Sequence, residues 1–447
     1  MNYFFETYGC QMNSAESAAL RLVLQKRSWS QAPDMESADL VILNTCSVRA
    51  TAEQRVLGRL AQYGALKKKR RFTLIVAGCM ASRLGETLKI KAPAVDYVMG
   101  TSEGSRFPYI LEALEQGTSF LEASEKPVFS FSSSHLEEGQ FRSFVPIMHG
   151  CNNFCSYCIV PYVRGPEVSR NPADIREEIK LLAEKGVREI TLLGQNVNSY
   201  HWEGTEDSGF PQSIDFPRLL ELVAAETEKT SIQWVRFLSS HPKDLSSRAI
   251  QVMAEHPVFC RHLHLCVQHG SNTVLSAMNR RYTREQYLEL AAEIREALPE
   301  ITLSTDILVG FPGETSDDLA QTLDLMEKVR FLYAYMYHYN PREGTPAFDL
   351  PQRVDETVKR KRLAQVIALQ KQHTLQLLAL RIGSREKVLI EGISRKNADE
   401  LITRTERDEM VVVPGVSSMI GAFGEVTLSS LRGNTFHAKE LCLCPGD

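Results

Sequence analysis

Three cysteines in the segment 150–158 follow the spacing C-x3-C-x2-C: Cys151, Cys155 and Cys158. Cysteines spaced this closely are typical of metal ligands, and three unliganded thiols in a surface loop are the less favoured alternative. Iron–sulfur cubanes normally take four thiolates, so a set of three leaves one iron without a protein ligand. An open coordination position can bind a substrate or cofactor, as it does in catalytic zinc sites. The spacing therefore predicts a cluster that takes part in chemistry.

A second set of three cysteines is spread over the first 80 residues, at Cys10, Cys46 and Cys79. Each of them ends a β-rich run, and the runs are about one βα unit apart. Parallel strands present their carboxyl ends at one edge of a sheet, where open α/β sheets bind ligands, so the three thiols are expected to converge there. Gly9 and Gly78 would let the backbone approach a cluster closely. Three buried strand-end thiols without a ligand remain the alternative.

The elements that position these cysteines can be predicted from the alternation of β-rich and helical patterns. In the first part of the chain, strands are expected at 3–8, 40–45, 72–77 and 95–99, which indicates an α/β domain with a parallel sheet. Six further strands are expected at 144–148, 190–193, 233–238, 263–267, 303–309 and 332–339. Helical patterns separate them, among them 173–184, 216–226 and 284–297. This pattern predicts a partial (βα)6 barrel with its active face at the carboxyl ends of the strands.

A length of 447 residues suggests about three domains. We expect an N-terminal domain at 1–117, a linker at 118–142, and the barrel with a long connecting helix (354–380) at 143–380. The short β runs of 384–447, separated by Gly, Asn and Asp, predict a small antiparallel β-barrel. The basic run 359–362 in the connecting helix is interpreted as a solvated face.

Composition narrows the class of protein. The net charge is −4, so any contact with nucleic acid must be local rather than a global basic field. No stretch of 18 apolar residues and no positively charged leader is present, so we expect a cytoplasmic protein without a membrane partner. Ten cysteines in 447 residues are far fewer than a disulfide scaffold has.

The cysteine loop, with Tyr157 just before its last cysteine, resembles the signature of the radical S-adenosylmethionine (SAM) superfamily. Segment 431–436 resembles part of the TRAM domain, an OB-like RNA-binding module. With two sets of three cysteines, the whole chain resembles the radical SAM methylthiotransferases. Segments 7–13, 44–49, 163–165, 168–170 and 193–200 are similar to the branch of that family that acts on isopentenyladenosine in tRNA.

The resemblance implies two 4Fe-4S clusters: an auxiliary one on Cys10, Cys46 and Cys79, and a radical SAM one on the loop cysteines. It implies two SAM molecules per turnover, one that donates a methyl group and one that gives the 5′-deoxyadenosyl radical. The expected reaction is methylthiolation of carbon 2 of N6-isopentenyladenosine at position 37, next to the anticodon. The expected partners are that tRNA, an electron donor such as flavodoxin or ferredoxin, and an iron–sulfur or sulfide carrier. We expect a monomer.

The resemblance also implies roles for single residues. Contacts to SAM are expected from Tyr157, Gly194, Gln195, Gln268, Asp306 and Val309. The chain has Gly-Gln-Asn at 194–196 where many radical SAM proteins have Gly-Gly-Glu, so the contact to the SAM amino group is unassigned. Contacts to RNA are expected from Arg164, Arg170 and Arg432, with surface charges as the alternative for the first two. His269 has no assigned role, and Cys260, Cys266, Cys442 and Cys444 are expected to be unliganded.

Two other functions remain open from the sequence. The same chemistry could act on threonylcarbamoyl-adenosine or on a ribosomal protein, although segment 195–200 argues against this. A non-catalytic iron–sulfur protein that binds RNA or transfers electrons is the third hypothesis, but it would not need an open iron.

Overall fold

The computed structural model describes residues 1–47, 50–118, 129, 131, 139–204 and 213–444. The N-terminal sheet has five parallel strands in the order β2-β1-β3-β4-β5. They are β1 (Asn2–Thr7), β2 (Ser30–Gln31), β3 (Leu40–Thr45), β4 (Thr73–Gly78) and β5 (Tyr97–Met99). The helices are α1 (Gln11–Lys26), α2 (Ala50–Lys67), α3 (Cys79–Leu84), α4 (Thr87–Lys91) and α5 (Phe107–Glu115). The predicted parallel α/β domain is confirmed.

The central strand β3 is buried along its whole length, as expected for a parallel strand that is covered on both faces. Val41 packs in the same core as Leu60 of α2, on one face. Ile42 packs in the core of the other face, with Leu24 of α1 and Ile110 of α5. Packing on both faces holds the sheet in place, and with it the edge where the carboxyl ends of β1, β3 and β4 lie.

Six parallel strands form the partial barrel, as predicted. They are β6 (Arg142–Pro146), β9 (Glu189–Leu193), β12 (Trp234–Phe237), β13 (His262–His264), β14 (Thr302–Val309) and β15 (Tyr333–His338). They make two three-stranded sheets, which the parallel bridges Val235–Phe259 and Ser240–Leu265 connect. The larger outer helices are α7 (Pro172–Glu184), α8 (Phe216–Thr227), α9 (Ser247–Glu255), α11 (Arg284–Ala297) and α12 (Ser316–Val329).

The predicted strand 144–148 is split in the structure. β6 ends at Pro146, which has no N–H to donate and lies on an edge strand. The next residues, β7 (Met148–His149), pair antiparallel with β8 (Val168–Ser169). The cysteine loop and α6 (Val160–Arg164) lie between β7 and β8.

The helix α13 (Glu356–Ala379) matches the predicted connecting helix and packs against β14 and β15. The interpretation of 359–362 as a solvated face holds for only half of that run. Arg360 and Lys361 are exposed, whereas Lys359 and Arg362 are buried. The Arg362 guanidinium pairs with Glu314 at 3.0 Å, so this charge belongs to the interior.

The C-terminal sheet has seven strands in the order β20-β21-β18-β17-β16-β19-β22. They are β16 (Arg385–Ile393), β17 (Glu400–Thr405), β18 (Met410–Pro414), β19 (Phe423–Thr427), β20 (Ser430–Arg432), β21 (Thr435–His437) and β22 (Leu441–Leu443). The pairing is antiparallel as predicted, except that β18 and β21 run parallel.

This sheet packs against the amino ends of the barrel strands. Trp234, the first residue of β12, meets Phe423 edge-on with ring centroids 4.9 Å apart. Glu189, the first residue of β9, accepts hydrogen bonds from Arg236 (3.0 Å) and from Arg404 of β17 (2.6 Å). A buried, charged contact therefore joins the C-terminal domain to the barrel.

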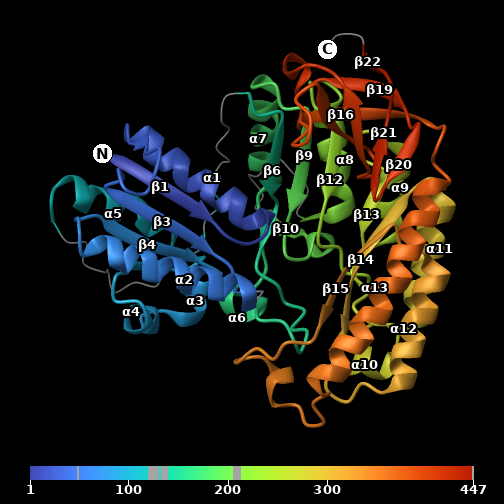
Figure 1. The fold of residues 1–447 in the computed structure, drawn as a ribbon, viewed down its shortest axis with the longest axis horizontal. Helices are drawn as coiled ribbons and strands as arrows, with labels where there is room; N and C mark the ends of the chain where they lie inside the picture. The colour runs from blue at the N-terminus through green and yellow to red at the C-terminus, as the bar shows by residue number, and fades with distance from the viewer. Residues whose placement is uncertain (48–49, 119–128, 130, 132–138, 205–212, 445–447) are drawn as a thin grey trace.

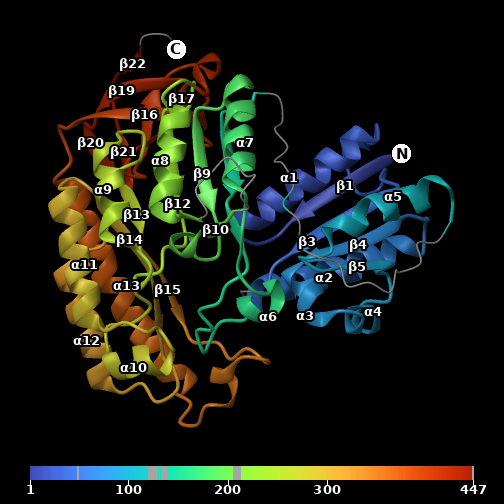
Figure 2. The ribbon, with the colours of Figure 1, turned by 180° about the vertical axis from the view of Figure 1, so that it is seen from behind.

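The N-terminal domain lies on the opposite side from α11, α12 and α13, next to β6 and α6 (Figures 1 and 2). Its α1 contacts β6, and its α3 contacts α6. Most of the predicted linker 118–142 lies outside the described residues. In the part of the chain that is described, no helix has the length and apolar composition that crossing a bilayer would require.

Candidate active site between the domains

The loop that carries Cys151, Cys155 and Cys158 is held by close backbone contacts. Gly150 has φ +79°, and a Cβ there would lie 1.9 Å from the carbonyl oxygen of Pro166. A side chain at this position is therefore excluded. The Cys151 N–H donates to the Gly165 carbonyl at 3.2 Å, and the Ser156 N–H donates to the Met278 carbonyl at 3.0 Å. The residue after α6 and the residue after α10 (Asn272–Ala277) thus hold the loop in place.

The surroundings of these thiols suit a thiolate ligand set. Burial raises the pKa of Cys151 to about 11 and that of Cys158 to about 12, so deprotonation needs a bound cation. The guanidinium of Arg280, a buried residue, donates to Cys155 Sγ at 3.3 Å. Donors to ligand sulfurs are the usual neighbours of cluster cysteines. Three thiols and a buried cation therefore fit the chemistry of an iron–sulfur cluster.

The structure brings the second set, Cys10, Cys46 and Cys79, to one edge of the N-terminal sheet. Cys10 is the N-cap of α1, Cys46 directly follows β3, and Cys79 is the first residue of α3. Burial is the main cause that raises the pKa of Cys79 to about 11; Arg164 opposes this increase, and Glu16, Cys46 and Cys10 make smaller contributions to it. The convergence predicted from the strand ends is thus seen among the described residues.

Two glycines make this convergence possible. At Gly9, φ is +132° and a Cβ would lie 2.7 Å from the Cβ of Cys46. At Gly78, φ is +91° and a Cβ would lie 2.5 Å from the carbonyl oxygen of Thr45. The Asn13 side chain accepts from Cys10 Sγ at 3.3 Å and donates to the same Thr45 carbonyl at 3.0 Å. The three strand ends therefore pack without room for additional side chains.

The two cysteine sets approach each other at α6. Cys79 forms an apolar cluster with Ile159 and Val163, and Ile159 directly follows Cys158. The Arg164 side chain is 3% exposed and pairs with Glu16 of α1 at 2.6 Å. The helix that follows the cysteine loop is thus the contact surface for the auxiliary set.

A cavity of about 1090 Å³ lies between the three domains. Cys10 and Cys46 line it from the N-terminal domain, His264 and Asp306 from the barrel interior, and Arg404 from the C-terminal domain. Ligand pockets for drug-sized molecules occupy about 300–1,000 Å³, so a modified nucleoside could be accommodated. The described lining residues include none of the loop cysteines.

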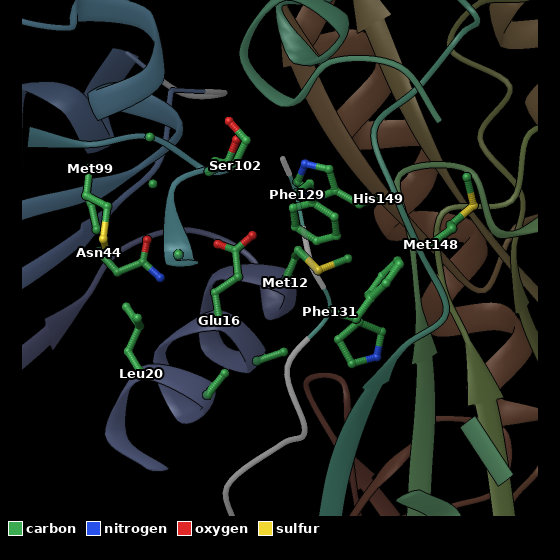
Figure 3. A pocket seen from close by; sticks show the side chains of 18 residues that line it. Met12, Glu16, Leu20, Asn44, Met99, Ser102, Phe129, Phe131, Met148 and His149 are labelled. Atoms are coloured by element: carbon green, nitrogen blue, oxygen red, sulfur yellow. The ribbon is translucent and has the colours of Figure 1, made fainter. Parts of the chain in front are cut away.

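A smaller pocket lies between α1 and β7, and Figure 3 shows the side chains that line it. Phe129 stacks on His149 with ring centroids 3.7 Å apart. Burial, together with the nearby Arg164, lowers the pKa of His149 to about 3. The Arg170 guanidinium lies over the Phe131 ring at 5.8 Å. Aromatic rings from the predicted linker therefore fill space between the N-terminal domain and the barrel.

Three segments of the chain match known families. Residues 2–100 match the Uncharacterized protein family UPF0004, residues 145–326 match the Radical SAM superfamily, and residues 379–439 match the TRAM domain. These three matches fall on the N-terminal domain, the barrel and the C-terminal domain, in order along the chain. The radical SAM and TRAM resemblances predicted from the motifs are confirmed.

Curated relatives match over nearly the full length. A tRNA-2-methylthio-N(6)-dimethylallyladenosine synthase of Treponema pallidum subsp. pallidum is 50% identical over 452 residues, which cover 98% of each chain. The protein of that name from Treponema denticola is 49% identical and covers 98% of this chain and 100% of its own. The chain belongs to this synthase family. It is therefore a radical SAM enzyme of the methylthiotransferase class, as the motifs predicted.

Solved structures with low sequence identity share the fold of this family member. The radical S-adenosylmethionine methyltransferase TsrM from Kitasatospora setae is 14% identical, with a TM-score of 0.59 over 78% of this chain and 74% of its own. The cobalamin-dependent radical enzyme OxsB is 12% identical, with a TM-score of 0.53 over 83% of this chain and 56% of its own. These likenesses support the arrangement of sheet and barrel.

Five of the six predicted SAM contacts lie at the carboxyl ends of barrel strands or on the cysteine loop. A Cβ on Gly194 would lie 2.4 Å from Met148 Cγ, and buried Gln195 Oε1 has no hydrogen-bond partner among the described residues. Gln268 has φ +67° and bridges to β14 through its backbone. Val309 ends β14, and Tyr157 packs against the apolar cluster that includes Phe311. Their role in binding SAM in this synthase family member stays a prediction.

Asp306, the sixth predicted SAM contact, lies within β14 and faces the cavity. Its carboxylate is 3.5 Å from His264 Nε2 and 3.4 Å from Cys266 Sγ. From the sequence, Cys266 is expected to be unliganded, and no role is predicted for His264 or for Arg280 beside the cysteine loop. The H-x-H-x-C spacing at 262–266 could have indicated that these side chains share one face of a strand, because alternate residues of a strand face the same side.

The three predicted RNA contacts are placed differently. Arg164 is buried against Glu16, as described above, and Arg170 is buried and pairs with Glu178. Arg432, in β20, is exposed. In this arrangement only Arg432 of the three presents its side chain to solvent, and RNA binding by each stays a prediction.

The residues without an expected role also have defined environments. His269 is fully buried, and its Nδ1 accepts from the Ser271 N–H at 3.1 Å. Cys260 is buried in a cluster with Trp234 and Phe423, and Cys442 is exposed. These contacts account for His269 and Cys260 as structural residues.

Proposed function

We propose that this chain methylthiolates carbon 2 of N6-isopentenyladenosine at position 37 of tRNA and so forms 2-methylthio-N6-isopentenyladenosine. The observation that carries the proposal is full-length identity of 50% to proteins named for this reaction. The contact of Cys79 with the segment that follows the cysteine loop, and a cavity lined by all three domains, support it.

We infer that Cys151, Cys155 and Cys158 hold the radical SAM 4Fe-4S cluster and that Cys10, Cys46 and Cys79 hold an auxiliary one. When bound, these clusters and SAM supply the radical, the sulfur and the methyl group of the reaction. The protein's own contribution is to fix the ligands: Gly150 and Ser156 hold the loop, Arg280 donates to Cys155, and Gly9 and Gly78 let the strand ends meet.

The cavity is the proposed site for the target base. An enzyme that modifies a base edge must take the base out of its stack, and an anticodon loop supplies it already single-stranded. Tyr335 and Tyr337 line the cavity and offer aromatic faces for stacking. The isopentenyl group would add about 25 cal/mol for each Å² of apolar surface buried. Adenosine without that group is therefore expected to be a poorer substrate.

The partners of the reaction are part of the proposal. A tRNA with isopentenyladenosine is the substrate, flavodoxin or ferredoxin is the reductant, and an iron–sulfur or sulfide carrier replaces consumed sulfur. The chain is proposed to act as a monomer in the cytoplasm. The exposed Arg432 in the C-terminal domain, the TRAM match, is the proposed contact to tRNA outside the cavity.

The test is mass spectrometry of tRNA nucleosides from a deletion strain, with and without the gene restored. Isopentenyladenosine should accumulate in the deletion strain, and its 2-methylthio form should return on complementation. Loss of methylthiolated threonylcarbamoyl-adenosine instead would assign the other substrate. If a reduced sample given SAM forms no 5′-deoxyadenosine, the assignment of radical chemistry to this chain is contradicted.

A further inference from the structure

Three side chains with different donor atoms meet in the barrel, beside the cavity: His264 on β13, Cys266 two residues after it and Asp306 on β14. One nitrogen, one sulfur and one oxygen atom from them all lie within 4.8 Å of one another. Two of the separations are 3.4 Å, from Cys266 Sγ to Asp306 Oδ2, and 3.5 Å, from His264 Nε2 to the same oxygen. Among the described residues, no other group of three or more His, Cys, Asp or Glu side chains brings its donor atoms this close together.

These separations are those of a tetrahedral metal site. Zinc binds cysteine sulfur at about 2.3 Å and histidine nitrogen or carboxylate oxygen at about 2.0–2.2 Å. Two ligands at those distances on a tetrahedron are about 3.3–3.7 Å apart. The three donor atoms could therefore share one ion with small side-chain adjustments.

A neighbouring hydroxyl orients the histidine for this purpose. Ser304, which pairs with His264 across the β13–β14 ladder, has its Oγ 2.9 Å from His264 Nδ1. The other ring nitrogen, Nε2, is the one that faces Asp306. Histidines that ligate metals usually have the second ring nitrogen held in this way.

We propose that His264, Cys266 and Asp306 bind one divalent transition-metal ion of the zinc class, in addition to the clusters on the two cysteine sets. Three protein ligands leave the fourth tetrahedral position open, as in catalytic zinc sites. His264 and Asp306 line the cavity that Cys10 and Cys46 also line, so the open position faces the proposed substrate space. The inference does not depend on which nucleoside the enzyme modifies.

The site is also linked to the cysteine loop. The Cys266 carbonyl accepts from Arg280 Nη2 at 2.7 Å, and Nη1 of the same guanidinium donates to Cys155 Sγ. One arginine therefore spans from the backbone of a proposed ligand to the thiol of a cluster cysteine. The proposed ion site is therefore connected to the cysteine loop through one buried arginine.

The experiment uses the full chain with its iron–sulfur clusters reconstituted, so that the cluster cysteines are already occupied. Zinc is added, free metal is removed, and zinc and iron are measured together by mass spectrometry. We expect about one zinc per chain in the wild type, and at least a tenfold lower zinc content in Cys266→Ser and in His264→Gln. Cys442→Ser is the matched control, because it removes an exposed thiol elsewhere and should keep the wild-type zinc content.

Cobalt(II) provides a second readout that loss of folding would not imitate. The wild type and Cys442→Ser should show a thiolate-to-cobalt charge-transfer band, whereas Cys266→Ser should lack it at unchanged iron content. Equal zinc content in Cys266→Ser and wild type would overturn the site. Absence of zinc and cobalt from the wild type would also overturn the proposed site; the three side chains would then only contact one another. Should Cys266→Ser fail to fold, His264→Gln decides between these outcomes.

Discussion

Replacement of Gly78 by alanine tests whether the backbone around Cys79 assembles the auxiliary cysteines. Gly78 has φ +91° and ψ −162°, and residue 78 is the N-cap of α3. A Cβ there would lie 2.4 Å from Asn44 Oδ1 and 2.5 Å from the Thr45 carbonyl oxygen. The strained backbone costs about 1–3 kcal/mol, and the overpacking adds about 1–3 kcal/mol.

The matched control is at the other end of the same helix. Gly85, the C-cap of α3, has φ +51° and ψ −142°, but a Cβ there meets nothing within 4 Å. Gly85→Ala therefore has the free-energy cost of a positive φ but no steric overlap of the new Cβ with neighbouring atoms. We expect Gly78→Ala to be less stable than Gly85→Ala by about 1–3 kcal/mol. For a domain of this size that is about 4 °C per kcal/mol in the unfolding midpoint.

The assay combines thermal unfolding with iron and sulfide analysis after reconstitution. Gly78→Ala should keep about four irons per chain, those of the cysteine loop, while Gly85→Ala keeps about eight, because each cubane holds four. SAM cleavage should persist in both variants. Equal stability and equal iron content in the two would refute the argument that close approach of β4 to β3 positions Cys79.

Three more predictions follow from the sites. Combined replacement of Cys10, Cys46 and Cys79 by alanine should abolish the 2-methylthio product but leave SAM cleavage, as measured by 5′-deoxyadenosine; normal product would exclude the auxiliary site as the sulfur source. Glu189→Gln should lose about 3–5 kcal/mol in thermal unfolding because the buried Arg236 guanidinium loses its carboxylate partner, whereas Glu221→Gln, whose partners Arg218 and Arg248 are exposed, should lose less than about 1 kcal/mol. Arg432→Ala should weaken tRNA binding and reduce the slope of log K against log salt by about 0.9, with the exposed Arg360→Ala as control; identical slopes would count against Arg432 as a phosphate contact.

The Glu189 prediction includes a pH dependence with a definite sign. Burial alone would raise the pKa of Glu189, but Arg236 and Arg404 hold it below its usual 4.5. A carboxylate with a lowered pKa contributes its stabilisation above the usual value and loses it as the pH falls through the folded-state pKa. The stability difference between wild type and Glu189→Gln should therefore shrink when the pH is lowered below about 4.5. A difference that grows in acid would contradict the assignment of Glu189 as the charged partner.

The features that the sequence predicted well are those that local patterns determine. Apolar runs such as 40–45 are buried on both faces of a parallel sheet, so strand positions and the convergence of Cys10, Cys46 and Cys79 could be derived. Motif spacing identified the cysteine loop in the same way. The break at Pro146 and the parallel pairing of β18 with β21 were missed, because pairing direction depends on contacts across the fold.

Charged residues were the hardest to place, because their environment depends on partners far away in the sequence. Arg164 is predicted from its place beside the cysteine loop to contact RNA, with a surface charge as the alternative, yet Glu16, 148 residues away, pairs with it in the interior. Arg280 carried no recognisable motif, yet it donates to Cys155 across 125 residues. In a buried site, a cation is stable only where a carboxylate or thiolate compensates it. The positions of Arg164 and Arg280 therefore follow from partners that local sequence does not reveal: the Glu16 carboxylate for Arg164 and Cys155 Sγ for Arg280.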